Sequence, residues 1–187
     1  EDSGYSTQQM SELQRQRTAV FAGITNASLH GAVAAGARPS SFARLANRVS
    51  YALNLHGPSI AIDSLCSSSL VAIHEACEYI RCGRGDMALA GAVNLNLDPA
   101  GYVRRSREGL LAHSRAGGAF TKGGTGYIPG EAVGVFVLKN LEHALRDGDD
   151  IYAVIRGSAV NHSGRMNAFG APNPRQQAAV MRQALVS

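Results

Sequence analysis

The sequence predicts an α/β protein whose sheet is covered by helices on both faces, and two observations lead to this class. Continuous apolar runs of strand length alternate along the chain with segments in which apolar residues recur every three or four positions, the spacing of one helical face. The chain has 187 residues, 45% of them hydrophobic and 17% charged, which suits one globular domain or a piece of a larger one. No repeat, linker or domain boundary is visible, so residues 1–187 are expected to form part of one domain.

The first predicted elements are two helices and the strand between them. Ser6 and Gln9 form a capping-box pattern, which predicts the start of a short helix, and the apolar run 18–25 predicts a buried strand. From Pro39 onward, apolar residues recur at helical spacing up to Leu53, so a second helix is expected there. The following His-Gly-Pro sequence ends that helix.

The middle of the chain predicts a strand, helix, strand unit. An apolar strand over 59–63 precedes a helix over about 67–81, which Gly83 ends, and a second apolar strand covers 87–95. Such units join parallel strands by a right-handed crossover. These two strands are therefore expected to lie parallel in one sheet.

The last third continues the alternation. Asp98 followed by proline predicts a helix N-terminus, with the helix running to about Leu111. A glycine-rich loop leads to a strand over 132–140, a short helix ends at the next Asp-Gly pair, and a further strand is expected over 151–160. Asn173 followed by proline begins a final helix.

Charge and hydropathy argue against two classes of partner. The net charge is +4, but the basic residues are scattered apart from Arg104, Arg105 and Arg107, and no aromatic residues interleave with them. A solvated helix face explains that run better than a nucleic-acid site. The apolar runs are too short to span a bilayer and no export signal is visible, so no membrane partner is expected.

The three cysteines have spacings that match neither a zinc site nor a secreted disulfide framework, so we expect no metal and a reducing, cytoplasmic setting. Cys66 stands out because it falls in the turn between a buried strand and a helix. Backbone N–H groups and the helix dipole there favour a nucleophilic thiolate and a bound oxyanion. The alternative is a small buried apolar residue. Cys77 is expected in the core, and Cys82 at the helix end has no obvious partner.

Two neighbouring motifs have ordinary structural interpretations. Serines 67–69 are expected to cap the helix, since the G-x-S-x-G pattern of a hydrolase nucleophile is absent. The glycine-rich segment 123–134 lacks the spacing of phosphate-binding loops, so nucleotide binding is not expected. Its glycines are expected to allow tight turns.

The stretch "GPSIAIDSLCSSSLVAIHEAC" followed by "MALAGAVNL" resembles the active-site region of β-ketoacyl synthases, and the resemblance covers essentially the whole chain. "NHSGRMN" with "APNP" is most similar to ketosynthases of modular polyketide synthases served by separate acyltransferases. The resemblance implies a thiolase-like layered α/β/α/β/α fold, only partly present. It also implies decarboxylative Claisen condensation in polyketide or fatty acid biosynthesis, with Cys66 carrying the acyl chain.

The resemblance further implies an acyl carrier protein partner whose phosphopantetheine carries the substrates, a homodimer, and no directly bound cofactor. Leu65 would border the acyl pocket, although a packing role is equally compatible with the sequence. The family also requires two histidines in motifs such as H-G-T-G-T, and neither motif occurs here. The chain is therefore expected to be an internal fragment that is inactive alone.

Two other functions stay open. A truncated, non-catalytic ketosynthase-like chain would serve for docking or dimerisation, and a thiol hydrolase would need a histidine held beside Cys66. His162 lies where relatives often carry glutamine and is expected to be a loop residue near the site. His74 falls on the polar side of the cysteine helix and is expected to be solvated.

Overall fold

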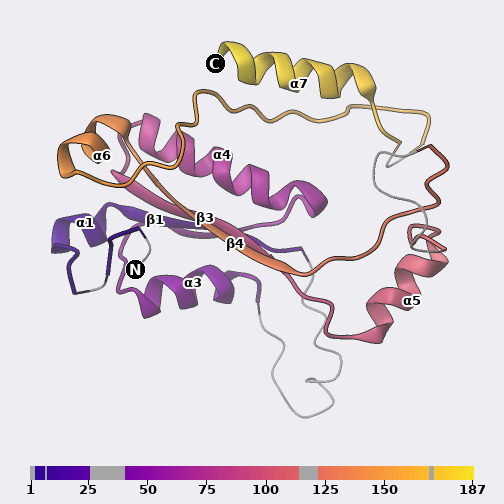
Figure 1. Cartoon of the computed structure of the whole chain (residues 1–187), viewed down its shortest axis with the longest axis horizontal. Helices are drawn as coiled ribbons and strands as arrows, with labels where there is room; N and C mark the ends of the chain where they lie inside the picture. The colour runs from indigo at the N-terminus through magenta and orange to yellow at the C-terminus, as the bar shows by residue number, and fades with distance from the viewer. Residues whose placement is uncertain (1–2, 7, 26–40, 114–121, 169–170) are drawn as a thin grey trace.

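The computed structural model describes residues 3–6, 8–25, 41–113, 122–168 and 171–187, and Figure 1 shows its arrangement. The strands are β1 (Thr18–Gly23), β2 (Ser59–Ile62), β3 (Met87–Asn94) and β4 (Ala132–Lys139). The helices are α1 (Glu12–Gln16), α3 (Ala43–Ala52), α4 (Ser68–Arg81), α5 (Pro99–Arg107), α6 (Leu141–Asp147) and α7 (Pro174–Val186), and a 3-10 turn, η1 (Leu65–Ser67), leads into α4. No helix in these described ranges is long and apolar enough to cross a membrane.

The four strands form one sheet in the order β2-β1-β3-β4. β1 runs parallel to both β2 and β3, while β4 is antiparallel to β3. The register places Phe21 beside Ile60 and Ala90, and Ala90 beside Phe136. The strand, helix, strand prediction is thus confirmed, with β1 inserted between its two strands.

Helices cover the two faces of the inner strands, α4 on one side and α3 on the other (Figure 1). Every residue of β1 is buried, and its alternate side chains enter two separate clusters. Ala19 and Phe21 pack against Ala72, Ala76 and Tyr79 of α4, with Phe21 and Tyr79 in an edge-to-face contact at 6.0 Å. The alanines let α4 approach the sheet closely, and the aromatic pair fills the remaining space.

On the opposite face, Val20 and Ala22 pack with Ala46 of α3. Met10, from the segment before α1, and Leu55, from the segment after α3, complete this cluster. This division follows from the two-residue repeat of a strand, which sends neighbouring side chains to opposite faces. The predicted two-sided cover is therefore confirmed for the inner strands. It is wrong for β4, where six of eight residues are exposed and the other two are half-buried.

The first helix begins later than the sequence pattern suggested. The capping box lies at Ser11 and Gln14: the Ser11 N–H donates to the Gln14 side chain at 2.8 Å, and the Gln14 N–H donates to Ser11 Oγ at 3.2 Å. Ser6 and Gln9 instead hold a turn that precedes it. Both pairs have the same S-x-x-Q spacing, so the pattern alone did not distinguish them.

Other helix boundaries differ from the predicted ones by a few residues. The start predicted at Pro39 lies outside the described residues, and α3 ends at Ala52. Asp98 and Asn173 cap α5 and α7 as expected, but α5 ends at Arg107 because Gly109, with φ 68°, turns the chain before Leu111.

The segment 151–160 is not a strand, which corrects the prediction. No strand in the described part of the chain pairs with it, and Tyr152 and Val154 are 86% and 52% exposed. It runs between α4 and α7 (Figure 1). A strand needs a neighbour for its N–H and C=O groups, and an apolar sequence does not supply one.

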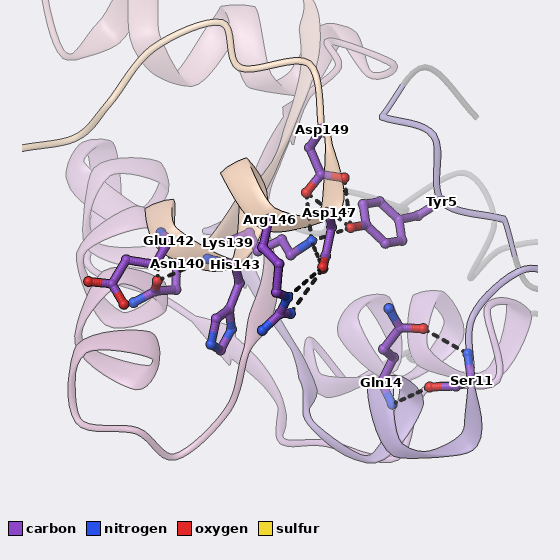
Figure 2. Close-up of polar contacts among 10 residues, drawn as sticks. All are labelled: Tyr5, Ser11, Gln14, Lys139, Asn140, Glu142, His143, Arg146, Asp147 and Asp149. Atoms are coloured by element: carbon purple, nitrogen blue, oxygen red, sulfur yellow. Dashed lines mark hydrogen bonds and ion pairs between the residues drawn. The ribbon is translucent and has the colours of Figure 1, made fainter.

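A charged cluster ties the N-terminal segment to the end of β4 (Figure 2). Lys139 Nζ donates to Asp147 and Asp149, both at 2.6 Å, and to the Tyr5 hydroxyl. The Tyr5 hydroxyl in turn donates to Asp149 Oδ1 at 2.8 Å. Burial lowers the pKa of Lys139, but these hydrogen bonds outweigh it and raise the pKa above the ordinary lysine value.

Candidate active site

Cys66 lies where the sequence predicted, in the link between a parallel strand and the helix that crosses the sheet. It is the central residue of η1, which runs directly into the 14-residue helix α4, and it is exposed. The helix N-terminus supplies N–H groups without partners inside the helix, together with the positive end of the helix dipole. Its exposure in this structure argues against the buried apolar role. Its catalytic role stays a prediction.

The residue before the cysteine has an unusual backbone. Leu65 has φ 58°, in the left-handed region that residues other than glycine seldom adopt, and its side chain is 65% exposed. Its N–H donates to Asp63 Oδ1 at 3.1 Å. Its carbonyl accepts from the Ser68 N–H, from Ser68 Oγ at 2.6 Å and from Thr25 Oγ1 at 3.0 Å. The turn that presents Cys66 is thus held on both sides of Leu65.

The serines after the cysteine do not cap α4 as predicted. Ser67 occupies the N-cap position but makes no side-chain capping bond, because η1 enters the helix directly and leaves Ser67 in a helical conformation. Its hydroxyl donates to the Ser64 carbonyl at 2.8 Å. Ser68 Oγ accepts the Ser64 N–H at 2.9 Å and is nearly buried. These hydroxyls fix the turn around Cys66 instead.

The end of β1 packs closely against the first turn of α4. A Cβ atom added at Gly23 would lie 2.9 Å from the Ser68 carbonyl carbon and 2.9 Å from the Ser69 nitrogen, closer than real Cβ contacts come. Glycine is required here by this backbone approach. It brings Thr25, two residues further on, within reach of Ser68 Oγ at 3.1 Å.

The other two cysteines have different surroundings. Cys77 is half-buried, and burial raises the pKa of its thiol, which disfavours the thiolate. The core position predicted for Cys77 was partly wrong, because the fully buried face of α4 carries Ala72 and Ala76 instead. Cys82 is exposed at the C-cap of α4, as expected for a residue at the helix end.

The histidine predictions have mixed outcomes. His74 is not simply solvated, because its Nδ1 lies 2.9 Å from Ser158 Oγ and so links α4 to the segment 151–160. His162 is exposed, and its Nδ1 accepts the Gly164 N–H at 2.9 Å within a local turn. No hydrogen bond in the described ranges joins either ring to Cys66. The histidine beside the thiol that a hydrolase needs is therefore not found among the described residues.

Superposition on solved ketosynthase structures shows that this chain forms part of a thiolase-like fold. A ketosynthase domain from the oxazolomycin pathway of Streptomyces albus JA3453, OzmH KS7, superposes with a TM-score of 0.88 at 39% identity, covering 98% of this chain and 34% of that one. The ketosynthase from module 6 of the Bacillus subtilis 168 bacillaene synthase gives 0.85 at 39% identity, with 97% and 32% covered.

The sequence matches the family Beta-ketoacyl synthase, N-terminal domain, over residues 1–144 and Beta-ketoacyl synthase, C-terminal domain, over residues 152–187. The chain belongs to the beta-ketoacyl synthase family, and within it to the ketosynthase domains of polyketide synthases. The polyketide synthase ThaQ of Burkholderia thailandensis is 52% identical over 171 residues, which are 91% of this chain and 8% of ThaQ. The chain thus spans about a third of the two ketosynthase structures and a small share of the synthase.

Proposed function

We propose that this chain is part of a 3-oxoacyl-[acyl-carrier-protein] synthase of polyketide assembly, with Cys66 as the acylated nucleophile. One observation carries the proposal: in a chain of this family, the exposed thiol lies in a hydrogen-bonded turn at the N-terminus of α4. The thiol has access to a large substrate, and the helix end favours negative charge beside it.

The proposed reaction has two stages. The Cys66 thiolate attacks the thioester carbonyl of an acyl chain carried on phosphopantetheine, and the pantetheine sulfur leaves as a thiol after taking a proton. A malonyl-type extender then loses carbon dioxide, and the resulting enolate carbon attacks the acyl-cysteine carbonyl. The Cys66 thiolate leaves, and the 3-oxoacyl product stays on the carrier. Backbone N–H groups at the helix end suit the oxyanion of each attack.

The proposal also covers partners and setting. The substrates would arrive on an acyl carrier protein, and the complete domain would form a homodimer in the cytoplasm. The similarity of the motifs "NHSGRMN" and "APNP" to ketosynthases served by separate acyltransferases supports that subtype as part of the proposal. Val135 and Phe136, on opposite faces of β4, are 60% and 57% exposed, which supports a larger domain that covers both faces of this strand. The 187-residue chain alone is therefore expected to be inactive.

The test uses the protein that carries this chain, expressed at its full length and incubated with an acyl thioester. Intact-mass measurement is expected to show one added acyl group. Cys66→Ala is expected to remove the adduct, whereas Cys82→Ala, a change at the other exposed cysteine, is expected to retain it. Undiminished acylation of the Cys66→Ala protein would overturn the assignment.

A further inference from the structure

We propose that Thr25 and Ser68 are positioning residues whose hydroxyls hold the Leu65 carbonyl and thereby fix the direction in which Cys66 presents its thiol. Thr25 follows the end of β1, and Ser68 is the first residue of α4. Neither hydroxyl has a hydrogen bond to Cys66, so both would act through the peptide before it. The inference rests on the proposed function, because the orientation of the Cys66 thiol affects activity only if that thiol is acylated.

The Leu65 carbonyl has more donors than a peptide oxygen usually receives. It accepts one backbone N–H and two hydroxyls, with Ser68 Oγ at 2.6 Å and Thr25 Oγ1 at 3.0 Å. The two hydroxyl oxygens are themselves 3.1 Å apart. A carbonyl oxygen has two lone pairs, so this convergence restrains it from several directions. Ser68 is only 5% exposed, so water has little room to replace its hydroxyl.

The restraint acts on a residue that would otherwise leave its conformation. A leucine at φ 58° is strained, and such residues persist only where their surroundings hold them. Packing of its own side chain does not do this, since that side chain is 65% exposed. The bonds to its carbonyl and its N–H are the interactions that keep Leu65 in the left-handed region.

The orientation of Cys66 follows from that of the Leu65 carbonyl. The described chain contains no cis peptide bond, so the Cys66 N–H points opposite to this carbonyl across a rigid peptide plane. Holding the oxygen toward Thr25 and Ser68 therefore fixes both the N–H and the Cα position of Cys66. If the plane rotated, the thiol would turn with it, and small misplacements of a reacting group slow reactions strongly.

Acylation kinetics of the full-length protein test the proposal. Thr25→Val keeps the shape of the side chain and removes the hydroxyl, and Ser68→Ala removes the second hydroxyl. Each is expected to lower the single-turnover acylation rate of Cys66 by about tenfold to a hundredfold, with little change in the thioester concentration that gives half-saturation. Thr25→Ser restores a hydroxyl and is expected to bring the rate back to within about threefold of the parent protein.

Two controls separate positioning from simple damage. Ser69→Ala removes a neighbouring hydroxyl that does not contact the Leu65 carbonyl, and it is expected to leave the acylation rate unchanged. Leu65→Gly removes the left-handed strain, so in that background Thr25→Val is expected to lower the unfolding midpoint less than in the parent. The comparison of unfolding midpoints still tests the proposal if one variant is too unstable for acylation kinetics.

The proposal is overturned if Thr25→Val and Ser68→Ala both acylate at the parent rate, or if Thr25→Ser fails to restore what Thr25→Val loses. That failure is distinct from failure of the proposed function. Loss of the adduct in Cys66→Ala together with parent rates in the hydroxyl variants would reject only the positioning role. Acylation that persists in Cys66→Ala would reject the nucleophile itself.

Discussion

The inner strand β1 and the outer strand β4 have similar apolar sequences and opposite surroundings. "TAVFAG" in β1 is buried at all six positions, whereas "AVGVFVLK" in β4 is exposed at its first six. β1 has a strand on each side and a helix over each face, but β4 pairs only with β3 among the described strands. The position of a strand among its neighbours, rather than its own hydrophobicity, decides whether its apolar surface is removed from water.

This difference matters for the candidate active site. Cys66 and the groups that hold its turn belong to the packed region: Thr25 follows β1, and Ser68 lies on the buried side of α4. The region from β4 onward instead presents apolar surface, including Val133 at 68% exposure. In the 187-residue chain the turn around Cys66 is therefore supported by the packed region, while the apolar surface from β4 onward is not covered by the described residues.

The strongest test of the comparison uses two phenylalanines in the same sheet. Phe21 of β1 is 4% exposed and Phe136 of β4 is 57% exposed, and each lies beside Ala90 on a neighbouring strand. Phe21→Ala is expected to lower the free energy of unfolding of the 187-residue chain by about 3–5 kcal/mol, because it leaves a cavity between α4 and the sheet. Phe136→Ala is expected to cost about 0.5 kcal/mol or less. Urea unfolding followed by circular dichroism measures both.

If both variants of the 187-residue chain lost the same free energy of unfolding, the contrast between β1 and β4 would be wrong. Measuring the same two variants in the full-length protein tests that contrast more sharply. If the larger domain covers β4, Phe136→Ala is expected to become more costly there, whereas the cost of Phe21→Ala stays the same, because its packing is already complete.

The sequence predicted those features that depend on local chemistry. The strand over 59–63 and the helix over 67–81 match β2 and α4 to within about a residue, since apolar periodicity and a terminal glycine define them. Asp98 and Asn173 were found as N-caps because a cap bonds only to residues two or three positions away. The placement of Cys66 followed from these boundaries.

Features that depend on distant residues were not predictable in this way. The bond from Thr25 to the Leu65 carbonyl spans 40 positions, and the contact of His74 with Ser158 spans 84. The apolar run 151–160 had the composition of a strand, but pairing depends on a neighbour that the run itself does not specify. One available signal was Gly23, since a glycine at a strand end indicates close backbone approach.

The charged cluster at the end of β4 provides the next test, because it joins the two regions through Tyr5. The hydrogen bond from Arg146, followed by that from Lys139, holds the pKa of Asp147 well below its ordinary value of 3.8. A lowered folded-state pKa stabilises the fold above the unfolded-state pKa, and this contribution is lost as pH falls toward the folded-state pKa.

We therefore expect the unfolding midpoint to fall as the pH is lowered from about 5 to 2, and Asp147→Asn to flatten that part of the profile. Thermal melts at closely spaced pH values measure this pH dependence of the unfolding midpoint. Asp150→Asn is the matched control, because Asp150 lies in the loop that follows Asp147 and is not among the residues of the cluster drawn in Figure 2. A profile that stays equally steep in Asp147→Asn would show that other carboxylates control acid unfolding.

The smallest effect is expected at the link between α4 and the segment 151–160. His74 Nδ1 lies 2.9 Å from Ser158 Oγ, and Arg81 donates to the Arg156 carbonyl at 3.3 Å, so two turns of the cysteine helix contact this exposed segment. Ser158→Ala is expected to cost about 1 kcal/mol of local stability and to speed cleavage of the segment in limited proteolysis roughly fivefold. Ser158→Thr keeps the hydroxyl and is expected to preserve the parent cleavage rate. Faster cleavage confined to 151–160, with β1 still resistant, would show that the outer region opens independently of the packed one, whereas equal acceleration in β1 would mean that the two regions unfold as a single unit.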